Sequence, residues 1–248
     1  MDTEKGLLKK YTREIGYAYG TLREAQVRNG LIAQSEQHRL YAGTATSLDT
    51  MDETCTVDLK LLRILDKALK DVKCPYTTKV LKGSPNYATI PIGRARYIYI
   101  GNELSPILED LEHMGRSMWV PYEDYAYGKD LAQGEKGRIY NFRFIEVNEM
   151  PSYQGQGAEA TDDNYYSSIG DDGKERYDVF PMLFVGPDSF ATIAFDANSA
   201  KVKTAMPKII PGVDNYGKLG VVSISWYFGL MVYREERIRQ LLTVSRVG

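Results

Sequence analysis

The sequence predicts a mixed α+β fold organised around one long helix, and three observations support this class. Apolar residues recur at steps of three and four through residues 6–37, which is the period of an amphipathic helix. Apolar residues alternate with a period of two through residues 221–233, which is the pattern of a strand about 40 Å long at about 3.3 Å per residue. Shorter helical and extended segments, separated by Gly and Pro, fill the chain between these two elements.

The first helix is expected to need support from outside itself. At about 1.5 Å per residue it would be about 45 Å long, and Gly16, Gly20 and Gly30 each cost about 1 kcal/mol relative to alanine inside a helix. Gly16 and Gly20 lie four residues apart on one face, where another backbone can approach. The helix packs either on the sheet of its own chain or on a partner. Its expected apolar seam consists of Leu8, Tyr11, Ile15, Ala18, Leu22, Ala25 and Ile32.

Composition limits the function classes. The 248 residues are 43% hydrophobic and 26% charged, with a formal net charge of -2, so no broad basic field favours DNA reading. The 19 tyrosines combine apolar area with a polar tip, which suits either protein interfaces or solvent-exposed sheet faces. No signal peptide or membrane-length apolar run is recognisable. Cys55 and Cys74 flank a predicted helix about 25 Å long, too far apart for a disulfide, so we expect free thiols in a reducing compartment.

The middle of the chain reads as alternating short elements. A helix is expected over residues 56–72, capped by Thr56 or a neighbouring threonine, with a stripe formed by Leu59, Leu62, Ile64, Leu65 and Leu69. Strands are expected over residues 94–100 and 138–147, and a helix begins at Pro106. Residues 154–176 are polar, acidic and rich in glycine, which predicts a long flexible excursion. Residues 177–185 predict a strand that is at an edge or bulged, because Pro181 lies in its middle, and residues 189–195 fit a strand or a helix.

Residues 113–134 form a long segment without a clean period that is rich in Tyr, Trp, Gly and Asp. A loop of this length is usually functional or mobile. Its prominent aromatic residues are Trp119, Tyr122, Tyr125 and Tyr127.

Motifs for catalysis or cofactor binding are weak. Residues 212–219 approach a phosphate-binding loop, but Leu219 stands where Ser or Thr would hold magnesium, and a strand follows instead of a helix. His38 and His113 are the only histidines, and they do not combine with the cysteines into a zinc spacing. We therefore predict no catalytic, cofactor-binding or metal-binding residues, no cofactor and no enzyme. A soluble hydrolase that uses two carboxylates stays the alternative from another class, and it would need a concave pocket and a monomer.

The order of segments resembles the Hong Kong ninety-seven type of capsid fold of tailed-phage major capsid proteins, and most closely its N-four-like branch. The segments that carry the resemblance are the helix that ends in residues 34–44, the helix at 57–72, and residues 96–104, 134–146, 179–188 and 222–236. Together they cover nearly the whole chain.

The resemblance implies a domain organisation. Residues 1–54 would form the spine helix and connector of a peripheral domain, residues 55–198 an axial domain, residues 199–240 the strands of the peripheral domain, and residues 241–248 a tail that returns to the axial domain. Family members carry an N-terminal arm and an extended hairpin ahead of the spine helix. This chain begins almost at that helix, so we expect these parts either to be truncated or to be absent from this member.

The resemblance also implies a function: a structural subunit that self-assembles into the icosahedral head of a tailed bacteriophage and encloses its DNA. The implied partners are copies of the chain itself in pentamers and hexamers, together with portal, scaffolding or decoration proteins. The resemblance makes residues 113–134 the candidate contact around the capsomer axis, and the candidate subunit-interface residues are Trp119, Tyr122, Tyr125 and Tyr127. Packaged DNA would be met only by non-specific proximity, and no membrane is implied. The implied location is the virion, after synthesis in the bacterial cytoplasm. A bacterial nanocompartment shell, as in encapsulins, shares the fold and is the nearest alternative.

Overall fold

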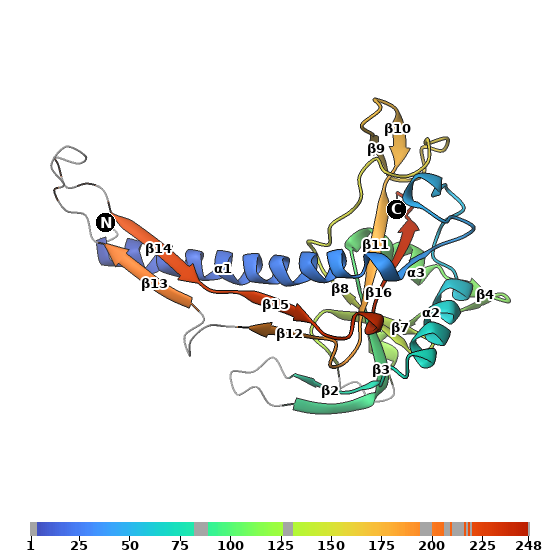
Figure 1. Ribbon diagram of the computed structural model, residues 1–248, viewed down its shortest axis with the longest axis horizontal. Coiled ribbons are helices and arrows are strands. Elements are labelled where there is room, and N and C mark those ends of the chain that lie inside the picture. The colour runs from blue at the N-terminus through green and yellow to red at the C-terminus, as the bar shows by residue number, and fades with distance from the viewer. Residues whose placement is uncertain are drawn as a thin grey trace. The chain divides into compact units, whose positions relative to one another are not determined.

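The computed structural model describes residues 4–81, 89–125, 131–193, 200–205, 209, 216, 218 and 220–247. Figure 1 shows the order of its elements. The helices are α1 (Glu4–Gln34), α2 (Leu59–Asp71) and α3 (Ser105–Glu109), with 3-10 turns η1 (Glu36–His38), η2 (Leu48–Thr50), η3 (Asn102–Leu104), η4 (Tyr122–Asp124) and η5 (Glu235–Arg237). The strands are β1 (Arg39–Tyr41), β2 (Thr77–Leu81), β3 (Thr89–Ile100), β4 (Glu112–His113), β5 (Arg116–Ser117), β6 (Val120–Pro121), β7 (Glu135–Ile139), β8 (Phe142–Glu146), β9 (Ser167–Ile169), β10 (Glu175–Tyr177), β11 (Val179–Val185), β12 (Phe190–Ile193), β13 (Ala200–Ala205), β14 (Val221–Trp226), β15 (Gly229–Val232) and β16 (Ile238–Val244).

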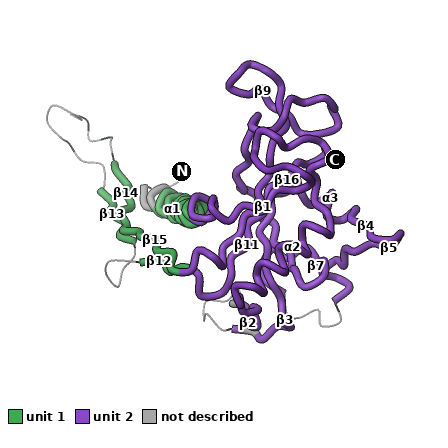
Figure 2. Tube along the Cα trace, turned by 45° about the vertical axis from the view of Figure 1, so that its right-hand side comes forward, with its two compact units in different colours: residues 1–30, 190–233 green, residues 31–189, 234–248 purple. Residues whose placement is uncertain are grey.

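The chain divides into two compact units, which Figure 2 draws in different colours. Unit 1 comprises residues 1–30 and 190–233, and unit 2 comprises residues 31–189 and 234–248. The capsid domains expected from the resemblance have other boundaries, and that assignment stays a prediction.

Unit 2 is built on a mixed sheet in the order β1-β16-β11-β3-β8-β7-β6, with β2 paired to β3. The pairs β1–β16 and β3–β8 are parallel, and the neighbouring pairs are antiparallel. The described edge strands β1 and β6 are only three and two residues long, which limits the unpaired backbone at the sheet edges. Residues 238–244, at the end of the chain, lie inside this sheet between β1 and β11.

The expectation that the strand with Pro181 lies at a sheet edge or is bulged is wrong. Its register with β16 runs without a shift. This strand, β11, lies in the middle of the sheet, and its first six residues are all buried. The ladder with β16 runs along the whole strand, whereas the ladder with β3 pairs only Leu183 and Phe184. Pro181 therefore lies in a stretch where only one neighbouring strand pairs with it, and this placement accommodates a residue without a backbone N–H.

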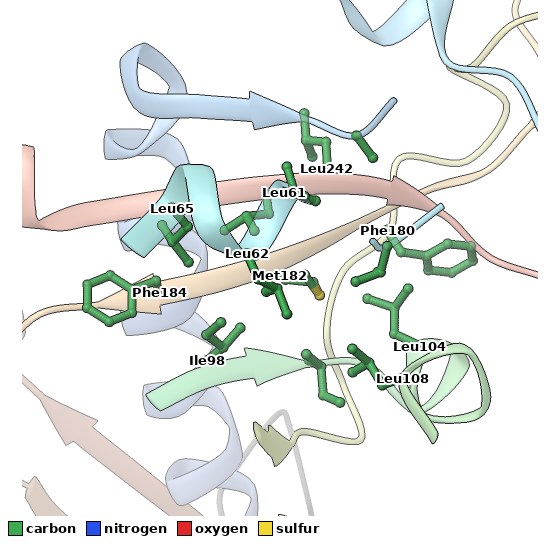
Figure 3. Close-up of a cluster of buried hydrophobic side chains, with 14 of the residues drawn as sticks. Leu61, Leu62, Leu65, Ile98, Leu104, Leu108, Phe180, Met182, Phe184 and Leu242 are labelled. Carbon is green, nitrogen blue, oxygen red and sulfur yellow. The ribbon is translucent and has the colours of Figure 1, made fainter. Parts of the chain in front are cut away.

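The core of unit 2 lies between α2 and the sheet. Figure 3 shows Leu61, Leu62 and Leu65 of α2 beside Met182 and Phe184 of β11. Burial of each such side chain stabilises the fold by about 1.5–3 kcal/mol. Ile64, which the sequence placed on the same stripe, is 45% exposed. The expected cap was also wrong: the carboxylate of Asp58 accepts a hydrogen bond from the Leu61 N–H at 2.6 Å, so Asp58 and not Thr56 caps α2.

A buried ion pair ties α2 to the sheet. The Arg96 guanidinium on β3, 1% exposed, donates to the Asp66 carboxylate on α2 and to the carbonyl of Cys74. Its Cζ also lies 4.4 Å from the centroid of the Tyr76 ring. Because either charge would be costly to bury alone, this pair fixes where α2 lies on the sheet.

Residues 154–176 are ordered and not the flexible excursion that composition predicts. The Asp178 carboxylate accepts hydrogen bonds from the Gly155 N–H at 2.7 Å and the Ser168 hydroxyl at 2.9 Å. The Tyr177 hydroxyl accepts from the backbone N–H groups of Thr161 and Asp162, each at 3.0 Å. Strand β9 lies within the segment and forms an antiparallel hairpin with β10, whose last residue is Tyr177. We call residues 154–176 the acidic lobe.

Unit 1 consists of most of α1 and two short ribbons, β12–β15 and β13–β14. The expected single strand over 221–233 is therefore two strands, β14 and β15, each with its own partner. The side-chain alternation nevertheless continues through both, because the even-numbered residues from Val222 to Val232 are half-buried and the odd-numbered residues are exposed, apart from the half-buried Gly229.

Candidate subunit interface

Trp119, the first predicted interface residue, packs against β7 and β8 of its own chain. Its ring lies 5.9 Å from that of Phe144, and a Cβ added at Gly137 would come within 2.3 Å of the indole. Gly137 therefore makes room for the Trp119 ring on the strand. The side chain remains half-buried and retains a partial surface.

Tyr125 is buried in unit 2. The guanidinium carbons of Arg138 and Arg143 lie 5.1 and 5.2 Å from the centroid of its ring, which is the geometry of a cation–π contact. Burial, followed by the nearby Glu135 carboxylate, raises the pKa of its phenol. Tyr125 therefore acts as a packing residue in this chain and offers little surface to a neighbour.

Tyr122 is the most exposed of the described candidates, at 39%. It begins the short turn η4, directly after Pro121 and three residues after Trp119. Tyr127 lies outside the described residues. The predicted interface at residues 113–134 therefore stays a prediction, supported by the exposed Tyr122 and the half-buried Trp119. The structure does bring Trp119 and Tyr125 onto the same sheet edge, through β6, β7 and β8.

A second candidate interface lies in unit 1, whose long helix the sequence placed either on its own sheet or on a partner, and whose ribbons the sequence did not single out as an interface. Every described side chain of unit 1 is exposed or half-buried, whereas unit 2 holds both hydrophobic clusters found in the described chain. Of the large hydrophobic residues that are exposed among the described ones, most belong to unit 1: Tyr11, Tyr17, Leu22, Ile193, Val202, Ile209, Tyr216, Val221, Tyr227, Met231 and Tyr233. Exposed apolar surface concentrated in this way is typical of an interface.

The helix face that meets the ribbons matches the predicted seam only in part, since Ile15 and Ala25 of that seam are half-buried. Tyr19 packs edge-on against Trp226 with ring centroids 5.2 Å apart, and a Cβ added at Gly30 would lie 2.5 Å from the Leu230 side chain. Tyr11 and Leu22 of the predicted seam are 58% and 46% exposed. The apolar side chains of α1 lie on more than one face, so their spacing alone did not identify the contact face.

Gly16 and Gly20 lie on an open part of α1. No described atom lies within 4 Å of a Cβ built at either position. The sequence suggested that another backbone approaches α1 at these glycines. No described segment of this chain does so.

The ribbons of unit 1 also have a second, outward face. It carries Val221, Tyr227, Met231 and Tyr233, which are 60%, 69%, 54% and 49% exposed. The strand registers place Lys201 opposite Ser225, Lys203 opposite Ser223, and Ala191 opposite Met231, so these partners share the face. We call this surface the outer ribbon face.

Further features of the described residues concern metal binding, thiols and membrane-spanning helices. Among the described residues no group of three or more His, Cys, Asp or Glu is arranged to hold a metal ion. Cys55 and Cys74 are free and buried, and burial raises the pKa of both thiols. No helix in the described part of the chain is both long enough and apolar enough to cross a membrane.

The chain was compared with family models, curated proteins and solved structures. No family model matches the chain. A major capsid protein of Pseudomonas phage KPP21 is 33% identical over 216 residues, covering 84% of this chain and 53% of that protein. The chain thus spans about half the length of the curated relative it matches.

Solved structures decide the fold. The capsid of Ralstonia phage GP4 matches with a TM-score of 0.53 at 14% identity, over 85% of this chain and 53% of that one. The head structure of Helicobacter pylori bacteriophage KHP40 matches with a TM-score of 0.58 at 10% identity, over 95% of this chain and 67% of that one. The chain has a phage-capsid fold. The expected mixed α+β capsid architecture is confirmed.

Proposed function

We propose that this chain is a major capsid protein, a structural subunit of a tailed-phage head and not an enzyme. The observation that carries the proposal is the 33% identity to a phage major capsid protein across 84% of the chain, together with the capsid fold. Its place of action is the virion.

The physical character of unit 1 supports self-association. A two-stranded ribbon is only marginally stable alone in water, and unit 1 has two of them beside a helix that contains three glycines, with no fully buried side chain among its described residues. Permanent subunit contacts bury about 2,000 Å² or more, and they can supply the missing burial. We therefore propose pentamers and hexamers of this chain as its main assemblies.

The finer family placement and the other partners belong to the same proposal. The ordered set of segments from residue 34 to residue 236 favours the N-four-like branch. Portal, scaffolding or decoration proteins would bind the assembled shell. The net charge of -2 suits an inner surface that meets packaged DNA without binding it tightly.

Sedimentation and electron microscopy of the purified 248-residue chain test the proposal. We expect rings of five or six copies, or larger shells, that form as the protein concentration rises. A chain that stays monomeric at high concentration would contradict the proposal, and turnover of a substrate by such a monomer would favour the hydrolase alternative.

A further inference from the structure

The outer ribbon face has two halves of different chemistry. Around β12 and β15 it is apolar, since neither strand contains a charged residue and Ile193, Met231 and Tyr233 are 44%, 54% and 49% exposed. Around β13 and β14 it is polar and cationic, because Lys201 and Lys203 pair across from serines. A strand face that meets only water is normally polar along its whole length. The apolar half therefore indicates a surface that another molecule covers.

Charge identifies the kind of molecule. Unit 1 contains ten Lys or Arg against six Asp or Glu, a formal charge of +4, and unit 2 carries the remaining -6. The two units of one chain type are therefore electrostatically complementary. A second copy can place its acidic unit against the basic unit of the first.

The acidic lobe is the part of unit 2 that matches both halves of the outer ribbon face. It contains six Asp or Glu against two Lys or Arg. Asp163 and Asp171 are exposed, and Ile169, two residues before Asp171, is 79% exposed. The lobe thus presents an apolar side chain beside carboxylates, as the ribbon presents apolar side chains beside lysines.

The lobe is held in place before any partner arrives. Asp178 and Tyr177 hold its backbone through the hydrogen bonds described above, and Arg176 donates to the carbonyl of Gly157 at 2.9 Å. Asp172 accepts from Arg176 at 2.8 Å, and this hydrogen bond is the main reason why the pKa of Asp172 falls to about 2. A preorganised surface loses less entropy on binding than a flexible one.

We propose that the outer ribbon face of one copy binds the acidic lobe of a second copy, with Lys201 and Lys203 against the lobe's carboxylates and Met231 in the apolar contact. This inference rests on the proposed self-association and names the two surfaces that meet. The contact joins two different surfaces, so it is heterologous and can generate a ring when the rotation closes.

Charge reversal tests the pairing. Variant A carries Lys201→Glu and Lys203→Glu, and variant B carries Asp163→Lys and Asp171→Lys. Each variant alone places like charges at the contact, and we expect its self-association to weaken by about tenfold or more. A mixture of A and B restores opposite charges wherever an A copy meets a B copy, so the mixture should regain association in rings with an even number of subunits, such as hexamers. Analytical ultracentrifugation at low and high salt gives the readout, and added salt should narrow the difference.

Control variants separate this effect from general charge changes. Lys60→Glu with Lys67→Glu makes the same charge change on the exposed side of α2 and should leave self-association unaltered. In the apolar half, Met231→Glu should weaken association, and Ile64→Glu, also at an exposed position, should not. Circular dichroism checks that every variant remains folded.

The outcomes distinguish the two proposals. If the unaltered chain associates and A and B each associate equally well, the inference is overturned and the proposed function stands. If A and B each fail to associate and their mixture also fails, the pairing with the lobe is wrong. If the unaltered chain itself does not associate, the proposed function fails and the inference fails with it.

Discussion

Unit 1 and unit 2 differ in how they are stabilised. Unit 2 places α2 on a sheet whose central strands are buried, and it fixes the contact with an Arg96–Asp66 ion pair. Unit 1 places a 31-residue helix, whose last turn belongs to unit 2, beside two ribbons, and every described side chain of the unit retains some exposure. Unit 2 therefore has a hydrophobic core of its own, whereas the described part of unit 1 has no fully buried side chain and is the part that the proposed self-association would cover. If that proposal holds, the contrast teaches that one chain can divide folding and assembly between two parts.

The largest expected loss of stability comes from a Leu→Ala substitution in α2, and the same substitution in α1 is its control. Leu65→Ala empties a fully buried position in α2 and should lower the free energy of unfolding of unit 2 by about 2–5 kcal/mol. Leu22→Ala, at a 46% exposed position in α1, should change it by less than about 0.5 kcal/mol. Urea unfolding followed by Trp119 fluorescence, in a Trp226→Phe background, measures unit 2 alone. Equal losses for the two variants would remove the distinction between the units.

A glycine pair gives effects of opposite sign. Gly137→Ala forces a methyl group into the Trp119 ring and should destabilise unit 2 by about 1–3 kcal/mol. Gly16→Ala meets no described atom within 4 Å and should stabilise α1 by about 0.5–1 kcal/mol. Circular dichroism of the unassembled chain reports the helix, and Trp119 emission reports the displaced indole. A gain in stability for Gly137→Ala would show that the indole does not occupy this place.

The alkaline limit of unit 2 gives a smaller effect. Burial, followed by the Glu135 carboxylate, raises the pKa of Tyr97 to about 12, against about 10 for an exposed tyrosine. The folded state keeps a proton that the unfolded state releases, so stability should fall as the pH rises from about 10 to about 12. Tyr97→Phe removes this contribution and should flatten that part of the profile. Burial also raises the pKa of Tyr125, so part of the loss of stability at high pH should remain in the Tyr97→Phe variant.

The measurement is the free energy of unfolding at about pH 9 and about pH 11. Tyr227→Phe, at a 69% exposed position of unit 1, is the matched control and should leave the profile of unit 2 unaltered. An unchanged slope in Tyr97→Phe would mean that this phenol does not govern the alkaline limit.

The sequence predicted the elements better than their partners. Leu59, Leu62, Leu65 and Leu69 recur on one face of α2 and are all buried, because a single strong apolar stripe leaves one way to pack. In α1 the apolar residues are spread around the helix, so the contact through Tyr19 had no unique signal.

Long-range hydrogen bonds explain the other differences. Composition predicted a flexible segment at 154–176, but Asp178 and Tyr177, just beyond it, hold it in place. Similarly, the alternation over 221–233 was correct, yet nothing local showed that β14 and β15 pair with different strands. One of the four predicted interface residues, Tyr125, packs under the guanidinium groups of Arg138 and Arg143. These arginines lie on β7 and β8, so the composition around Tyr125 could not predict its burial.

Hydrogen exchange of α1 in the unassembled and the assembled chain tests the central claim most directly. If unit 1 depends on neighbours, the backbone amides of residues 4–30 should exchange quickly in the unassembled chain, while the buried strands β11 and β16 are protected, and they should become protected on assembly. Protection of α1 in the unassembled chain equal to that of β11, with no gain on assembly, would contradict the account.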